Sequence, residues 1–181
     1  MRPGVLESPV LAAFAELLSY PGGGPAPAAR RCLDLVADRE ARDLLGRFLA
    51  RAERAGPFEM EELFTSTFDL RPACAPYVGH QLCGESPQRG AFLARLADVY
   101  REEGFRPEGE LPDHLSVVLR FLAAARPGPA RDDLLRDGLL PALDKMLAEL
   151  VDAENPYRAV LAALRAALAP AARAAPQEAR P

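Results

Sequence analysis

The sequence is poor in the residues that build disulfides and metal sites. It has three cysteines and two histidines in 181 residues. Cys32, Cys74 and Cys83 are too few and too far apart to form a disulfide framework. Cys74, His80 and Cys83 fall within one segment, but their spacing matches no zinc pattern and no fourth ligand is evident. We therefore expect no metal and no cofactor. A small helical enzyme or metal carrier that uses Cys74, His80 and Cys83 is kept as an alternative.

Long apolar runs and an excess of basic charge are also missing. No stretch approaches the roughly eighteen apolar residues that a membrane-spanning helix needs. The segment from Met1 to Glu7 has neither a long apolar run nor a cleavage site of small residues, so we expect no signal peptide. The formal net charge is −4, whereas a nucleic-acid-binding protein needs a basic surface. These absences predict a cytoplasmic protein with no nucleic-acid partner and no insertion into a membrane.

No set of catalytic residues stands out. The glycines at 22–24 follow a predicted helix, and no Gly-Lys-Ser/Thr comes after them, so they do not form a phosphate-binding loop. Glu110 and His114 are four residues apart with a proline between them. No second pair of this kind exists, which argues against a di-iron bundle. We expect the protein not to be an enzyme.

Alternating β-branched residues are lacking, and helical periodicity takes their place. Apolar residues recur at spacings of three and four in predicted helices at residues 8–19, 28–37, 44–55, 58–68, 86–103, 112–125, 131–153 (interrupted at 138–141) and 156–168. Residues 69–84 lose this periodicity and are predicted to be an ordered loop, with room for a short helix, packed by Leu70, Tyr77 and Val78. The patterns predict an all-α fold: a compact single-domain bundle of about eight to ten helices over residues 1–169. A disordered tail is expected at 170–181.

The segment Glu110-Leu-Pro-Asp-His114 begins the most apolar of these helices. Pro112 suits the first position of a helix, because an N–H there would have no partner within the helix. Asp113 would then fall in the first turn and complement the positive end of the helix dipole. The spacing does not distinguish a binding site from a capping aspartate beside a packed histidine. The apolar positions that follow are Leu115, Val117, Val118, Leu119, Phe121 and Leu122.

Five short motifs occur in the order seen in one protein family. They are Leu17-Leu-Ser-Tyr-Pro21, Phe64-Thr-Ser-Thr-Phe-Asp69, Tyr100 to Phe105, Glu110-Leu-Pro-Asp-His114 and Asn155-Pro-Tyr157. Over residues 10–168 the chain resembles the NarJ-type assembly chaperones, or delta subunits, of respiratory nitrate reductase, within the wider TorD/DmsD family of molybdoenzyme chaperones. The resemblance implies an all-helical, non-catalytic cytoplasmic protein. Such a chaperone binds the N-terminal segment of the apo catalytic subunit and holds it while the molybdenum cofactor is inserted.

The resemblance also implies a peptide-binding groove. Asp113 and His114 match the element that contributes to the peptide site in relatives, and residues 64–77 match the region that builds the facing wall. An amphipathic helical peptide would place its apolar side chains against Phe64, Phe68, Tyr77, Val117 and Phe121. Its basic side chains would meet Asp69, Glu110 and Asp113. The alternative for each aromatic residue taken singly is a plain core position.

The resemblance leaves two points open, the construction of the peptide pocket and the identity of the client. It has no tryptophan, although some members place one in the groove loop, so its pocket must be built differently. Related chaperones serve perchlorate, selenate and ethylbenzene dehydrogenase-type enzymes, which leaves the client open. A helical scaffold subunit retained in the mature complex is a further alternative. The loop at residues 69–84 is compatible with a domain-swapped dimer as well as with a monomer.

Overall fold

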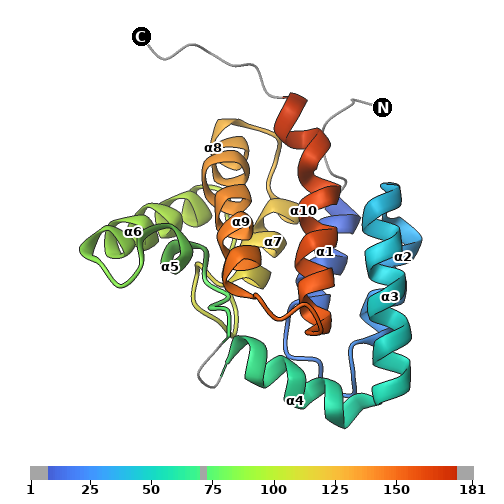
Figure 1. The fold of residues 1–181 in the computed structure, drawn as a ribbon. Coiled ribbons are helices and arrows are strands. Elements are labelled where there is room, and N and C mark those ends of the chain that lie inside the picture. The colour runs from blue at the N-terminus through green and yellow to red at the C-terminus, as the bar shows by residue number, and fades with distance from the viewer. Residues whose placement is uncertain (1–7, 70–72, 175–181) are drawn as a thin grey trace.

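The computed structural model describes residues 8–69 and 73–174, and its regular elements there are helices, with no β-strand (Figure 1). This confirms the predicted all-α fold. The elements are α1 (Ser8–Leu17), α2 (Ala26–Leu35), α3 (Arg39–Ala55), α4 (Pro57–Phe68), α5 (Val78–Cys83), α6 (Pro87–Glu102), α7 (Leu115–Ala124), α8 (Pro129–Asp133), the π-helical segment η1 (Leu134–Leu139), α9 (Leu140–Glu149) and α10 (Pro156–Ala174). None of the described helices is long and apolar enough to cross a membrane.

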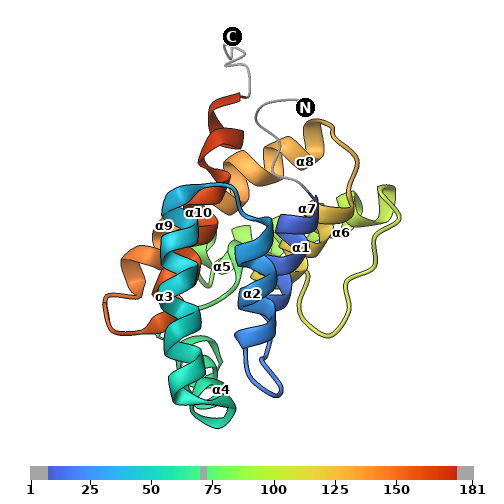
Figure 2. The same cartoon turned by 90° about the vertical axis from the view of Figure 1, so that its right-hand side faces the viewer.

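Helix α7 forms the centre of the core. It packs against α1, which packs in turn against α2, while α10 lies between α3 and α9 (Figures 1 and 2). Nearly all of α7 is buried, from Leu115 to Leu122, because apolar side chains cover most of its circumference. Helix α6 lies at one edge of the molecule and buries only Leu96 and Tyr100. The motif before α7 therefore leads into a helix that is almost wholly buried, whereas the neighbouring helix α6 is mostly exposed or half-buried.

Side-chain caps and glycines set several helix ends. Asn155 caps α10, because its Oδ1 accepts a hydrogen bond from the Tyr157 N–H at 3.0 Å. At the end of α6, Gly104 has a φ of +68°, and the Phe105 N–H donates to the Tyr100 carbonyl at 2.8 Å. The rings of Tyr100 and Phe105 meet edge to face at 4.9 Å. Phe105 thus folds back onto the last turn of α6.

The predicted break at residues 138–141 is wrong, because the chain stays helical from α8 through η1 to α9. The Leu140 N–H bonds to the Leu135 carbonyl, five residues back, as in a π-helix. Pro141 follows directly and has no N–H, and its ring would press on the carbonyl of Asp137 in an ordinary α-helix. The wider π-turn absorbs the proline without ending the helix.

The predicted disorder from residue 170 is wrong for residues 170–174. Helix α10 continues through Pro170 to Ala174. The preceding turns are anchored by Val160, Leu164 and Leu168, none of which is exposed. Because Pro170 lies near the end of the helix and faces solvent, the carbonyl it leaves without a helical partner can bond to water. The predictions for residues 175–181 and for Leu70 lie outside the described residues.

Candidate functional site

A single β-bridge joins the loop before α5 to the residues before α7. The Val78 N–H donates to the Asp113 carbonyl and the Leu115 N–H to the Pro76 carbonyl, both at 2.8 Å. The paired residues of the bridge are Tyr77 and His114, whose rings meet edge to face at 5.3 Å. Two parts of the predicted peptide site are thus brought together.

His114 is the residue that caps α7. Its Nδ1 accepts a hydrogen bond from the Ser116 N–H at 3.2 Å and lies 2.8 Å from the Ser116 Oγ. The helix begins at Leu115, so the prediction that Asp113 occupies its first turn is wrong. The physical reason is the bridge, because it holds the backbone at His114 extended against the loop before α5.

Burial makes His114 a neutral cap. The side chain is almost fully buried, and this burial lowers the pKa of His114 from 6.5 to about 4, with a smaller contribution from the Arg120 charge. The imidazole is therefore uncharged near neutral pH. An uncharged ring can accept a backbone hydrogen bond, as the cap requires, but cannot attract an anionic ligand.

Asp113 forms a buried ion pair with Arg89. Its carboxylate is not exposed, and its Oδ2 accepts from the Arg89 Nε at 3.3 Å. The other oxygen, Oδ1, has no hydrogen-bond partner among the described residues. The Arg89 guanidinium also lies 5.5 Å from the centre of the Tyr77 ring and 3.1 Å from Glu85. The sequence suggested that Asp113 is a surface acid that meets basic side chains of a peptide. In this structure it is buried instead and anchors the Arg89 side chain of α6.

A second contact links α6 to the same segment. The Tyr100 hydroxyl donates to the Pro112 carbonyl at 2.9 Å. Gly79 of α5 lies next to Asp113 and Phe92, and a Cβ on it would come within 2.8 Å of both the Asp113 Oδ2 and the Phe92 Cδ1. The absent side chain lets α5, α6 and the start of α7 meet. Sequence reasoning missed Arg89 and Phe92, since nothing in the spacing of α6 shows which of its half-buried residues face the motif.

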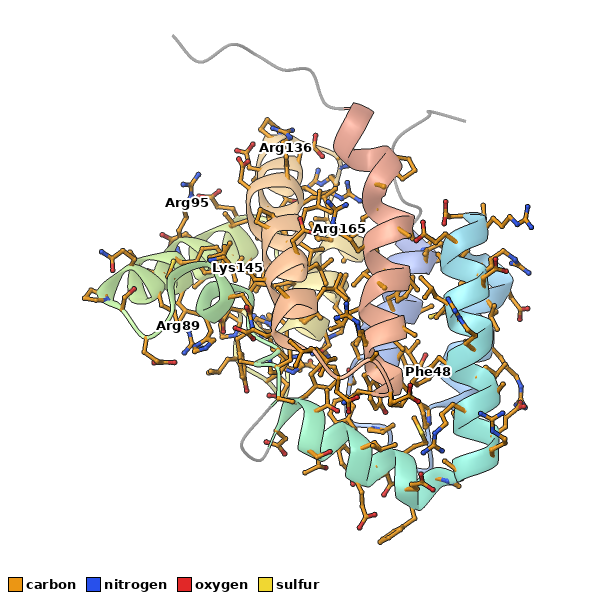
Figure 3. The ribbon with its side chains drawn as sticks, viewed as in Figure 1. Phe48, Arg89, Arg95, Arg136, Lys145 and Arg165 are labelled. Carbon is orange, nitrogen blue, oxygen red and sulfur yellow. The ribbon has the colours of Figure 1, made fainter. Side chains whose placement is uncertain are left out.

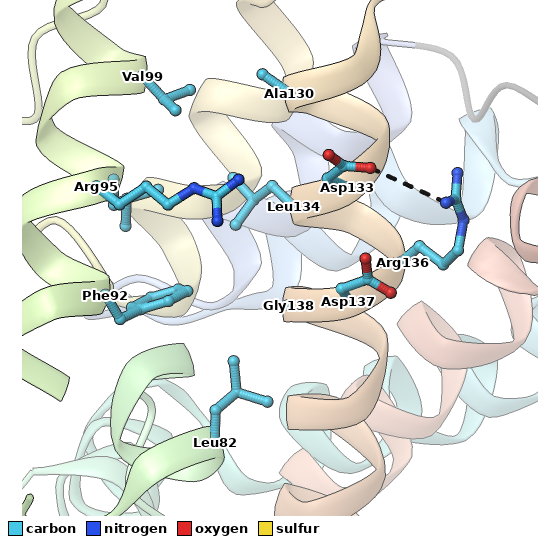
Figure 4. Close-up of a pocket in the computed structure, with 11 residues that line it drawn as sticks. Leu82, Phe92, Arg95, Val99, Ala130, Asp133, Leu134, Arg136, Asp137 and Gly138 are labelled. Carbon is cyan, nitrogen blue, oxygen red and sulfur yellow. Dashed lines mark ion pairs between the residues drawn. The ribbon is translucent and has the colours of Figure 1, made fainter. Parts of the chain in front are cut away.

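A cavity of about 460 Å³ lies beside Phe92, between α5, α6 and the α8–η1 segment (Figure 4). The Arg95 side chain extends from α6 across this cavity toward Leu134, and Asp137 stands on the opposite rim. Arg95 has no ion-pair partner among the described residues, whereas Arg136 pairs with Asp133 at 4.0 Å. The apolar side chains that line the cavity are Leu82, Phe92, Leu96, Val99, Ala130 and Leu134.

The cavity suits apolar side chains that lie next to charged ones. Its volume falls in the range of protein ligand sites, and one face of an amphipathic helix offers this mixture. Gly138, in the π-helical segment, helps to keep the cavity open, since a Cβ there would already press on Leu134 at 3.1 Å. Single π-turns inside helices are frequent at functional sites. Local sequence patterns do not reveal this cavity, because its walls come from three separate segments: Leu82, residues 92–99 and residues 130–138.

The remaining predicted groove residues lie elsewhere. Phe64 and Phe68 are buried in an aromatic cluster with Tyr157, at centroid distances of 5.5 and 5.4 Å. Val117 and Phe121 have no exposed surface, so in this conformation they cannot contact a peptide, and their placement in a groove wall needs this correction. They were assigned there because a helix that is apolar on most sides does not reveal which side is covered.

The other predicted site residues keep some access to solvent. Tyr77 is half-buried, and Glu110 and Asp69 are exposed. The structure thus places Tyr77, Glu110, Asp113 and His114 in one region, Phe64, Phe68 and Asp69 on or just after α4, and Val117 and Phe121 in the core.

Cys74 and His80, two of the residues considered above as metal ligands, have separate surroundings. Burial raises the pKa of the Cys74 thiol to about 12, so it stays protonated, and its Sγ lies 3.6 Å from the Met146 carbonyl. His80 instead contacts Glu85 at 2.9 Å. Among the described residues no group of three or more histidine, cysteine and acidic side chains could hold a metal ion. Figure 3 shows Lys145 between α9 and α5, where its Nζ donates to the Gln81 carbonyl at 2.8 Å.

Comparison with known proteins identifies relatives over most of the chain. The family described as "Nitrate reductase delta subunit" matches residues 35–163. The chain is 31% identical to the probable nitrate reductase molybdenum cofactor assembly chaperone NarJ of Bacillus subtilis, over 86% of each protein. It is 28% identical to the NarJ of Escherichia coli K12, covering 81% of this chain and 64% of that one. It is also 33% identical to the nitrate reductase-like protein NarX of Mycobacterium tuberculosis, of which it spans only 22%.

Proposed function

Because the chain belongs to the nitrate reductase delta subunit family, we propose that it is an assembly chaperone for a molybdoenzyme. It binds the N-terminal segment of the catalytic subunit and holds the apoenzyme while the molybdenum cofactor is inserted. Respiratory nitrate reductase is the favoured client, since the relatives called NarJ carry that enzyme in their names. This work would take place in the cytoplasm, without catalysis by the chaperone itself.

The observation that carries the peptide site is the cavity beside Phe92. An amphipathic helix of the client would insert apolar side chains between α6 and the α8–η1 segment, against Leu96 and Leu134. An acidic side chain of the client would pair with the free Arg95, and a basic one with Asp137. These contacts lie in a hollow lined by both apolar and charged side chains, where charge pairs fix the orientation of a ligand more than they add affinity.

Asp113 contributes to this site indirectly, by holding helix α6 in place. Arg89, Phe92 and Arg95 all lie on α6, so the Arg89–Asp113 pair fixes the helix that forms one wall of the cavity. Asp113 is then a positioning residue, and the region around Tyr77 and Glu110 is the surface next to it. This role explains why the charged Asp113 lies just before a buried helix, and it does not require the peptide to contact Asp113.

The proposal is tested by purifying the tagged chain from cells that make the client, with and without cofactor synthesis. The catalytic subunit should co-purify when cofactor synthesis is blocked and should be released when the cofactor is available. Retention on the fully loaded enzyme would favour a scaffold subunit instead of a transient chaperone. Absence of the subunit in both preparations would overturn the proposal. A client other than nitrate reductase would be identified by mass spectrometry of the same samples.

A further inference from the structure

Two exposed aromatic rings share a hollow on another face of the protein. Tyr20, in the loop after α1, is 60% exposed, and Phe58, in the first turn of α4, is 74% exposed. Both line a hollow of about 370 Å³, together with Glu61 and Glu62 of α4. We call these four residues the acidic-aromatic face. Single exposed apolar side chains need no explanation, but two aromatic rings that border one hollow form a patch that points to an interaction.

The acidic-aromatic face is held in place before any partner arrives. The Glu61 carboxylate accepts a hydrogen bond from the Gly23 N–H at 2.9 Å, and its other oxygen lies 3.4 Å from the Tyr20 hydroxyl. The Tyr20 ring also meets Phe64 edge to face at 6.0 Å. The loop after α1 is therefore tied to α4, and the position of the Tyr20 ring is set by contacts that a ligand would not have to create. Such preorganisation lowers the entropy cost of binding.

The charge of this face selects its partner. Glu62 has no ion-pair partner among the described residues, whereas the nearby Glu59 is paired with Arg51. The negative charge of Glu61 also raises the pKa of the Tyr20 phenol, which therefore stays neutral. Aromatic faces attract cations, and carboxylates next to them add to this attraction. An anionic or a purely apolar partner would not use these carboxylates.

We propose that the acidic-aromatic face binds a protein segment that presents a lysine or arginine side chain among apolar residues. The cationic group would lie over the Tyr20 or Phe58 ring and pair with Glu62, while neighbouring apolar side chains cover the exposed part of the rings. The face is built from α4 and the loop after α1, so it shares no residue with the cavity beside Phe92. The proposal does not require the chain to act as a chaperone.

The test is nuclear magnetic resonance of the full chain, labelled with nitrogen-15, titrated with two synthetic peptides. One is an amphipathic helix of leucine and lysine, and the other is its charge-reversed counterpart of leucine and glutamate. The lysine peptide should shift the amide signals of Tyr20, Gly23 and Glu62, and the glutamate peptide should not. Higher salt should weaken binding, because the contact is exposed to solvent.

Two exposed positions provide variants that fold normally. Phe58→Ser and Glu62→Gln should each weaken the lysine peptide about fivefold, the equivalent of one exposed cation–π contact or ion pair. Val151→Ser changes an exposed side chain outside the face and should leave affinity unchanged. Shifts spread over all acidic surfaces, shifts centred on the cavity beside Phe92, or unchanged affinity in both variants would overturn the proposal.

Discussion

Gly79 and Asp113 are so close that no side chain fits between them. A Cβ on Gly79 would lie 2.8 Å from the Asp113 Oδ2, a distance that real Cβ atoms do not adopt. The same atom would also press on Phe92 of α6. The contact therefore joins α5, α6 and the residues before α7 at one point. Asp113 is therefore part of the packing that holds α6, one wall of the cavity, and does not lie on an open surface.

The first prediction concerns this contact. Gly79→Ala should destabilise the fold by about 1–3 kcal/mol, because the added methyl group overpacks a buried site. Gly90→Ala is a matched control within α6, where a Cβ would meet no atom within 4 Å. It should be neutral or stabilise by up to about 1 kcal/mol, as alanine usually does in a helix. Urea denaturation measures both, and equal effects of the two substitutions would contradict the packing argument.

The second prediction concerns the Arg89–Asp113 pair. Arg89→Met leaves the buried Asp113 charge without a partner and should cost about 3 kcal/mol of unfolding free energy. Asp113→Asn should cost less, since Arg89 keeps some contact with water and with Glu85. The double variant should be more stable than the sum of the two losses predicts, because neither charge is then isolated. Strictly additive losses would show that the two side chains do not stabilise each other.

The third prediction is a pH dependence from His114. Its pKa in the folded protein is about 4, against 6.5 when unfolded, so the unfolded chain binds the proton more readily. The contribution of His114 to the free energy of unfolding is therefore fully present above pH 6.5 and is lost as the pH drops toward 4. The loss from this residue should be on the order of 3 kcal/mol. His114→Asn keeps a capping side chain but cannot take up a proton, so its unfolding free energy should fall less over this range. Identical pH profiles would rule out this origin.

The fourth prediction separates two roles of Asn155. Its Oδ1 caps α10, and its Nδ2 donates to the Thr67 Oγ1 of α4 at 2.8 Å. Asn155→Asp keeps the cap and loses the donor, so it should cost about 1 kcal/mol. Asn155→Ala loses both and should cost roughly 1 kcal/mol more. Thermal unfolding orders the three proteins, and an aspartate variant that is no more stable than the alanine variant would show that the cap contributes nothing.

The helical fold could be predicted from the sequence because it depends on local patterns. The periodicity of Val160, Leu161, Leu164 and Leu168 identifies their common buried face, and the Asn155-Pro156 pair identifies the start of that helix. At two prolines, Pro141 and Pro170, the sequence predicted an interruption or an end of a helix that the structure does not show. A proline ends a helix only where its neighbours cannot adjust, and the chain adjusts with a π-turn before Pro141 and by exposure at Pro170.

The site was predicted less well, since it depends on contacts between distant segments. Asp113 and His114 were identified, but their roles differ from the prediction, because the bridge to Tyr77 moves the helix start to Leu115. Arg89 could not be found from sequence, as an arginine in a weakly amphipathic helix gives no sign of a buried partner. The cavity beside Phe92 likewise depends on packing between α6 and the π-helical segment, which no local pattern encodes.

We propose above all that this chain binds the N-terminal segment of a molybdoenzyme catalytic subunit at the cavity beside Phe92. Calorimetric titration of the full chain with that synthetic peptide tests it most directly. We expect micromolar or tighter binding, which Phe92→Ser should weaken strongly. Val151→Ser, at an exposed position outside the cavity, should leave the affinity unchanged. No heat of binding from the folded wild-type protein, or equal affinity in both variants, would contradict it.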